Sequence, residues 1–249
     1  MVNTALSIGA AVGVLLSAGF VYWQVGRYAA PQVPESRFDE RKEMFAYTAG
    51  LFVGIPLVFP LLGLFQSIPP FEIGGIALYL GLLVAGCELA QWLLLRSVYF
   101  GKDGSGAFYA LGFRAGVAGI LILAWVAEYF TRPTFSASAI AGVLAISLGI
   151  LGLETVCALL ALPNRADRPG RATGPFTAVP LEAIGFFFLG FASGSSPGVA
   201  VVGGLLIASM AGWLYRSIAS PNLSIVAPPG GKAPVEELAK SSFGRLDRP

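Results

Sequence analysis

The chain has 249 residues, of which 55% are hydrophobic and only 12% are charged. A soluble domain carries roughly 25% charged residues, so most of the surface of this chain is not expected to face water. The formal net charge of +2 is no signature of nucleic-acid binding, and we predict no nucleic-acid partner. The chain has no histidine, which argues against haem, most zinc and copper sites and Ser-His-Asp or Cys-His catalysis. We therefore expect no cofactor, no metal site and no enzymatic activity.

Seven apolar runs approach the roughly 20 residues that a bilayer core requires. They cover residues 5–25, 45–65, 73–95, 107–129, 137–162, 176–192 and 198–215. The first run has no charged segment before it and is long enough to span, so we interpret it as a membrane helix rather than a signal peptide. The prediction is an all-α, polytopic transmembrane bundle over residues 1–216.

Two parts of this prediction are less simple. The sixth and seventh runs are separated only by residues 193–197, a Gly/Ser/Pro break, and a re-entrant pair is the alternative to two full spans. Residues 217–249 are rich in Pro, Gly and Ser, which predicts a mostly disordered cytoplasmic tail.

Basic residues gather in alternate connections between the runs. The connections after the first, third, fifth and seventh runs hold Arg27, Arg37, Arg41, Lys42, Arg96, Lys102, Arg165, Arg168, Arg171 and Arg216. The opposite connections hold only Arg132. Because cytoplasmic loops collect Lys and Arg, we predict that the N-terminus lies outside and the C-terminus inside. The expected location is the cell membrane, with the bilayer as the main environment.

Charges inside the apolar runs are the strongest functional signal. They are Glu88, Arg114, Glu154 and Glu182. Each costs roughly 2.5–3.5 kcal/mol at mid-membrane, so each is expected to face a partner or a water-filled cavity. At about 1.5 Å per residue, all four fall about 9–13 Å from the cytoplasmic ends of their helices, in one layer.

Direction along the helix separates these charges into two groups. Helical side chains lean toward the helix N-terminus, so Glu88 and Glu154 point toward the membrane centre. Arg114 and Glu182 lean toward the cytoplasm and can snorkel. Gln91 shares a helix face with Glu88, and residues beside Glu154 such as Cys157 can line a polar cavity or bond to other helices.

Two interpretations of this layer stay open. With three acids and one base, at least one acid is expected to hold a proton or bind a cation at neutral pH, which predicts a proton or cation site. In the other interpretation, Arg114 pairs with Glu88 or Glu154 to fix helix packing while Glu182 snorkels. The predicted ion-binding residues are Glu88, Gln91, Arg114, Glu154 and Glu182.

Glycine pairs with a spacing of four residues predict close helix packing, either within the bundle or in an oligomer. They are Gly9/Gly13, Gly50/Gly54 and Gly112/Gly116. The retinal-protein comparison that seven spans invite fails, because no lysine lies in an apolar run. The leading function is a small transporter or channel. The alternative is a structural or assembly subunit, with a homo-oligomer or other membrane subunits as partners; a membrane enzyme is the weakest class.

Overall fold

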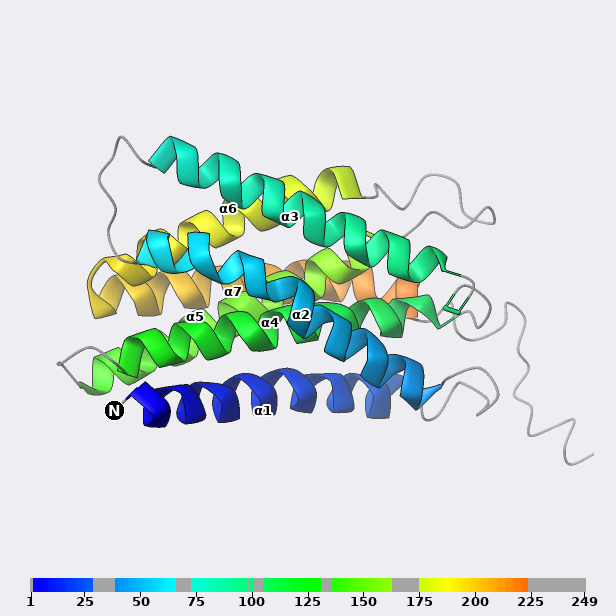
Figure 1. The fold of residues 1–249 in the computed structure, drawn as a ribbon, viewed down its shortest axis with the longest axis horizontal. Coiled ribbons are helices and arrows are strands. Elements are labelled where there is room, and N and C mark those ends of the chain that lie inside the picture. The colour runs from blue at the N-terminus through cyan, green and yellow to red at the C-terminus, as the bar shows by residue number, and fades with distance from the viewer. Residues whose placement is uncertain are drawn as a thin grey trace, which may run out of the picture.

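The computed structural model describes residues 2–28, 39–65, 73–97, 99–100, 105–130, 136–162 and 175–223. Within these ranges the chain forms seven α-helices and no β-strand, which confirms the all-α class (Figure 1). The helices are α1 (Val2–Tyr28), α2 (Glu40–Phe65), α3 (Ile73–Arg96), α4 (Gly106–Phe130), α5 (Ala137–Leu160), α6 (Pro175–Gly194) and α7 (Pro197–Leu223).

Each predicted apolar run coincides with one helix, and the differences lie at the ends. Helix α2 begins at Glu40, before the predicted Phe45, because Asp39 caps it: the Asp39 carboxylate accepts the Arg41 amide at 2.9 Å. Helix α7 continues to Leu223, so the predicted tail begins as helix rather than as disordered chain. The rest of the predicted tail lies outside the described residues.

Five of the helices are long and apolar enough to cross a bilayer: α1, α3, α4, α5 and α7. The chain is therefore a multi-pass membrane protein. The apolar part of α6, Ala178–Gly194, is shorter, and α2 begins with a charged turn. A count of seven full spans, the re-entrant alternative for α6 and the sidedness of the termini stay predictions.

Helices α4 and α5 form the centre of the bundle. Most residues of both are buried, whereas most residues of α1 and α7 are not. Helices α1 and α2 pack on α4, while α6 and α7 pack on α5. Figure 1 shows α1 along one edge of the bundle and α3 and α6 along the opposite edge, where these two helices pack together.

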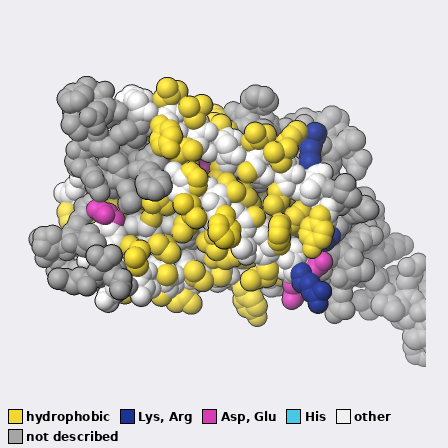
Figure 2. All heavy atoms as spheres, in the orientation of Figure 1, with side chains coloured by type: hydrophobic (Ala, Val, Ile, Leu, Met, Phe, Trp, Pro, Cys, Tyr) yellow, Lys and Arg dark blue, Asp and Glu magenta, His cyan; other side chains and the backbone are white. Residues whose placement is uncertain are grey.

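The outer surface is apolar along its length, and its basic side chains gather at one end. Large hydrophobic side chains are widely exposed, among them Leu15, Phe52, Leu78 and Trp213. In Figure 2 hydrophobic side chains cover the middle of the visible face, and the Lys and Arg side chains lie at one end of it. A belt of this kind fits the hydrocarbon core of a bilayer.

Small residues let the backbones of the outer helices α1 and α2 come into contact with the backbone of α4. The six glycines singled out in the sequence all lie in the contacts of α4 with α1 or α2: Gly9, Gly13, Gly50, Gly54, Gly112 and Gly116. A Cβ atom added at Gly54 would lie 3.1 Å from the Cα atom of Val117, and one at Gly116 would lie 2.8 Å from the amide nitrogen of Leu51. These glycine pairs therefore serve packing within the bundle.

Replacing Gly116 with alanine is expected to destabilise the bundle. The new methyl group would meet backbone atoms of α2, which cannot move aside alone, so we expect a loss of about 1–3 kcal/mol. Thermal unfolding in one detergent measures it. Gly86→Ala is the control, because a Cβ there meets nothing within 4 Å. An equal loss of stability in both variants would contradict the packing argument.

Candidate functional site: an arginine and three glutamates inside the bundle

Four helices contribute one charged side chain each to a single layer of the bundle: Glu88 on α3, Arg114 on α4, Glu154 on α5 and Glu182 on α6. Each lies within about 9–12 Å of the helix end on the same side of the bundle, at 1.5 Å per residue. We call these four residues the charged cluster. Their mutual contacts show that the layer inferred from the sequence is a single group of side chains.

Arg114 lies at the centre and contacts all three glutamates. Its Nη1 atom donates to Oε2 of Glu154 at 3.0 Å and to Oε1 and Oε2 of Glu182 at 2.9 and 3.0 Å. Its Nη2 atom lies 2.6 Å from Oε1 of Glu88. The planar guanidinium group offers its donors in a fixed fork, which is why a single arginine can bind acids from three helices.

Gln91 completes the set of five predicted residues. Its Oε1 atom accepts a hydrogen bond from Nε of Arg114 at 2.6 Å, and its Nε2 atom donates to the carbonyl oxygen of Ala158 at 3.2 Å. Gln91 lies one turn after Glu88 on α3, so the two share a face toward Arg114. The amide thus fixes the plane of the guanidinium group and connects α3 to α5.

The charged cluster is closed to solvent. Arg114, Glu154 and Glu182 are 0% exposed and Glu88 is 1% exposed. The interpretation in which Glu182 snorkels toward the cytoplasm is wrong, because its carboxylate turns inward and pairs with Arg114. Arg114 does not snorkel to solvent either, because it is 0% exposed.

The cluster holds more acid than base. With all groups ionised it carries three negative charges and one positive charge. Oε2 of Glu88 and Oε1 of Glu154 are buried and accept no hydrogen bond from any described residue. An unpaired carboxylate oxygen in a dry interior is costly, so these two atoms are places where a proton or a cation would be stabilised.

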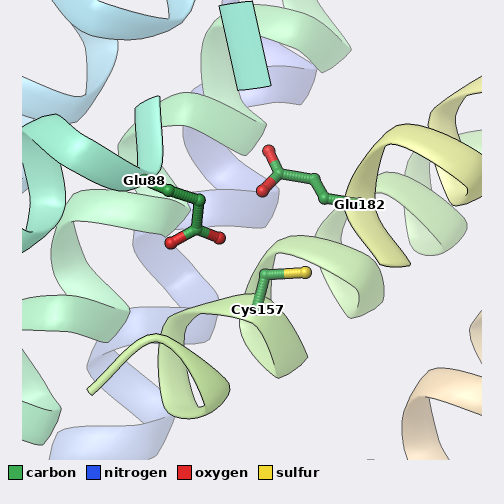
Figure 3. Close-up of side chains that lie close together, drawn as sticks. All are labelled: Glu88, Cys157 and Glu182. Atoms are coloured by element: carbon green, nitrogen blue, oxygen red, sulfur yellow. The ribbon is translucent and has the colours of Figure 1, made fainter. Parts of the chain in front are cut away.

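Cys157 is the site residue whose position the sequence did not reveal. Its sulfur atom, one carboxylate oxygen of Glu88 and one of Glu182 lie within 4.8 Å of one another. Figure 3 shows the carboxylates of Glu88 and Glu182, from α3 and α6, approaching each other beside Cys157 of α5. Its spacing of three residues from Glu154 gave a signal for a shared face. Thr155, by contrast, bonds back to Leu151 in its own helix.

Comparison with known proteins gives no further guide to this site. No protein-family model, no curated protein and no solved structure matches the chain. A function for the cluster therefore has to be argued from the geometry and charge of its own residues. Those residues establish a buried arginine–carboxylate cluster in an integral membrane protein.

A second buried acid, Glu43, lies outside this cluster in the first turn of α2. It is 5% exposed and lies against Gly112 of α4, and neither of its oxygens accepts a hydrogen bond from the described residues. Burial raises the pKa of Glu43 well above its ordinary value of 4.5. The predicted span begins after it, at Phe45, so Glu43 belongs to the end of the bundle.

Glu43→Gln is expected to stabilise the protein at neutral pH. Because the folded state holds the Glu43 proton more tightly than the unfolded chain, wild-type stability falls as pH rises above 4.5, and the variant escapes this loss. We expect a gain of about 1–2 kcal/mol at neutral pH that shrinks as pH falls toward 4.5. Thermal unfolding across this pH range measures it. Glu40→Gln, an exposed neighbour in the same turn, is the control and should show no such gain.

Proposed function

We propose that this protein is a small transporter or channel of the cell membrane, and that a proton or another cation binds at the charged cluster on its way across. The observation that carries the proposal is the uncompensated acid: three glutamates surround one arginine, and all four side chains are buried. Ionisable residues buried inside membrane-spanning helices are rare, and they mark ion pathways and proton relays.

Charge balance supports a site that exchanges its occupant. The cluster has an excess of two negative charges, and the cost of burying them falls when protons or a cation neutralise them. The unpaired oxygens of Glu88 and Glu154 are the acceptors that such an occupant would use. Arg114 contacts all three acids and so holds them together after the occupant leaves.

The position of the cluster supports a link between occupancy and helix movement. Arg114 connects its own helix α4 with α3, α5 and α6. Gain or loss of positive charge at the acids changes the attraction among these four helices. A bound ion can shift an equilibrium between two arrangements only through such a difference in affinity.

Flux in proteoliposomes tests the proposal. Purified wild type, Glu88→Gln and Glu154→Gln would be reconstituted, and proton and metal-cation entry followed with dyes inside the vesicles. We expect flux above that of empty vesicles for the wild type and a loss of at least tenfold in both variants, in keeping with the 10²–10⁴-fold reach of a positioned proton-transfer group.

Glu128→Gln is the matched control for this experiment. Glu128 lies near the far end of α4, about 21 Å along the helix from Arg114 at 1.5 Å per residue. The same substitution there should leave flux unchanged. Equal, leak-level flux in the wild type and all three variants would overturn the proposal.

A structural or assembly subunit of a larger membrane complex is the second candidate, and one observation favours it. An apolar groove of about 630 Å³ runs between α5, α6 and α7, with Ile184, Phe188, Val202 and Leu206 among the side chains that line it. A groove of this type fits a helix of a neighbouring subunit. Co-purification of a stoichiometric partner in mild detergent, lost in Val202→Trp, would favour this role; a monomeric wild type with flux would exclude it.

A further inference from the structure

Three side chains at one side of the charged cluster are arranged so that they could bind one metal ion. The sulfur of Cys157 and one oxygen each from Glu88 and Glu182 lie within 4.8 Å of one another, and all three residues are buried. Ligand atoms at about 2.0–2.3 Å from one tetrahedral zinc ion lie about 3.3–3.7 Å apart. The three atoms can therefore share one ion after side-chain shifts on the order of 1 Å.

An unpaired oxygen points independently to a ligand at this place. Glu88 holds Arg114 through Oε1, and its Oε2 atom accepts no hydrogen bond among the described residues although Glu88 is 1% exposed. Figure 3 shows this carboxylate directed toward Glu182 and Cys157. Glu182 binds Arg114 through both oxygens, so an ion would take one of them and leave the other to the arginine.

We propose that the cation bound by the charged cluster is a divalent transition-metal ion, held by the sulfur of Cys157 and the carboxylates of Glu88 and Glu182. This inference rests on the proposed function of the cluster as a cation site and names the class of cation. It departs from the prediction of no metal site, because the sequence does not show that Cys157 of α5 lies beside acids from α3 and α6.

Charge balance fits a divalent ion. Three glutamates and Arg114 sum to two negative charges, which one divalent cation cancels. If the thiol gives up its proton on binding, one proton on Glu154 restores neutrality, and its free Oε1 atom can carry that proton. Neutrality matters here because an unbalanced charge in a dry interior costs several kcal/mol, by the usual estimates.

The ligand atoms select the class of metal. Sulfur favours zinc, cobalt, cadmium and similar ions, whereas magnesium and calcium prefer sites made of oxygen alone. Two carboxylate oxygens and one sulfur form a mixed set that suits a borderline ion such as Zn²⁺ or Co²⁺. Glu154 and Gln91 lie outside this set: both contact Arg114, and Glu154 carries the balancing proton.

Cobalt binding to the purified full-length protein tests the proposal. The protein would be placed in nanodiscs and titrated with Co²⁺, and binding would be followed by the sulfur-to-metal charge-transfer band. The metal content of the protein would be measured after dialysis. We expect one Co²⁺ per chain, displaced by Zn²⁺ but not by excess Mg²⁺. Loss of a second-sphere group alone weakens metal sites 10–100-fold, so we expect Cys157→Ser to weaken binding at least about 100-fold.

Cys87→Ser is the matched control, because Cys87 is equally buried beside Glu88 but contributes no atom to the set. It should bind Co²⁺ as the wild type does and show the same charge-transfer band. Glu88→Gln and Glu182→Gln should lose affinity while remaining monodisperse.

Two results would overturn the inference: no stoichiometric Co²⁺ in the wild type, or binding that Cys157→Ser leaves intact. If the wild type then still passes protons in proteoliposomes, the proposed function survives without the metal. If Co²⁺ binds through Cys157 but neither protons nor metal ions cross, the metal site stands and the transport function fails.

Discussion

Arg114→Met is expected to abolish the folded protein or to destabilise it by about 3–5 kcal/mol, the usual cost of removing one partner from a buried ion pair. The substitution keeps most of the side-chain volume but leaves Glu88, Glu154 and Glu182 without their shared cation. It also removes the donor to Gln91. Yield of monodisperse protein and its thermal unfolding in detergent measure the loss.

Arg114→Lys separates the charge of the arginine from its shape. Lysine keeps the positive charge but presents a single ammonium group, which cannot contact three carboxylates and Gln91 in the same fixed plane. We expect a stability between those of the wild type and Arg114→Met. A lysine variant as stable as the wild type would show that charge alone is sufficient, and that the forked geometry contributes nothing.

The elements of the fold were predictable because each apolar run is as long as a bilayer is thick. In a chain with few charges, the ends of such runs are set by polar residues. Most helix ends lie within about three residues of them, and the exceptions are the start of α2 and the end of α7, which continues to Leu223. The start of α2 was predicted too late because its first turn is charged. Hydropathy alone placed the start at Phe45, but the cap at Asp39 lets the helix begin at Glu40.

The depth of the charged cluster was predictable, and so was the pairing of Arg114 with Glu88 or Glu154, but not that Glu182 joins them. Counting residues along a helix gives the distance of a side chain from the membrane surface, and this placed four charges in one layer. Which of them meet depends on how each helix is rotated and which helices are neighbours. Those choices are made by packing, and seven similarly apolar helices carry little signal for them.

The central place of α4 illustrates this limit. Its glycines at 112 and 116 and the buried Arg114 are signals of a crowded helix, and the structure places them against α2 and at the centre of the cluster. Gly9/Gly13 and Gly50/Gly54 carry the same spacing on helices at the periphery. The motif predicts a close contact but does not say which helix supplies the other side.

Replacement of the whole charged cluster by methionine is expected to restore a folded protein that carries no cation. The variant combines Arg114→Met with the same substitution at Glu88, Glu154 and Glu182. Exchanging a buried ionic group for apolar side chains of similar volume is often neutral or stabilising by 1–4 kcal/mol, because no charge is left to desolvate. We expect its thermal stability to return to within about 2 kcal/mol of the wild type, far above that of Arg114→Met.

This variant separates the two interpretations of the cluster. A purely structural ion pair contributes nothing beyond helix packing, so a well-folded apolar replacement would keep any flux that the wild type shows. A cation site contributes the acids themselves, so the same replacement would reduce flux to the level of empty vesicles and abolish Co²⁺ binding. Among their described residues, α3, α5 and α6 have no buried acid other than the three glutamates of the cluster. Flux that persists in a folded variant without the cluster would therefore show that the ion pathway lies elsewhere in the protein.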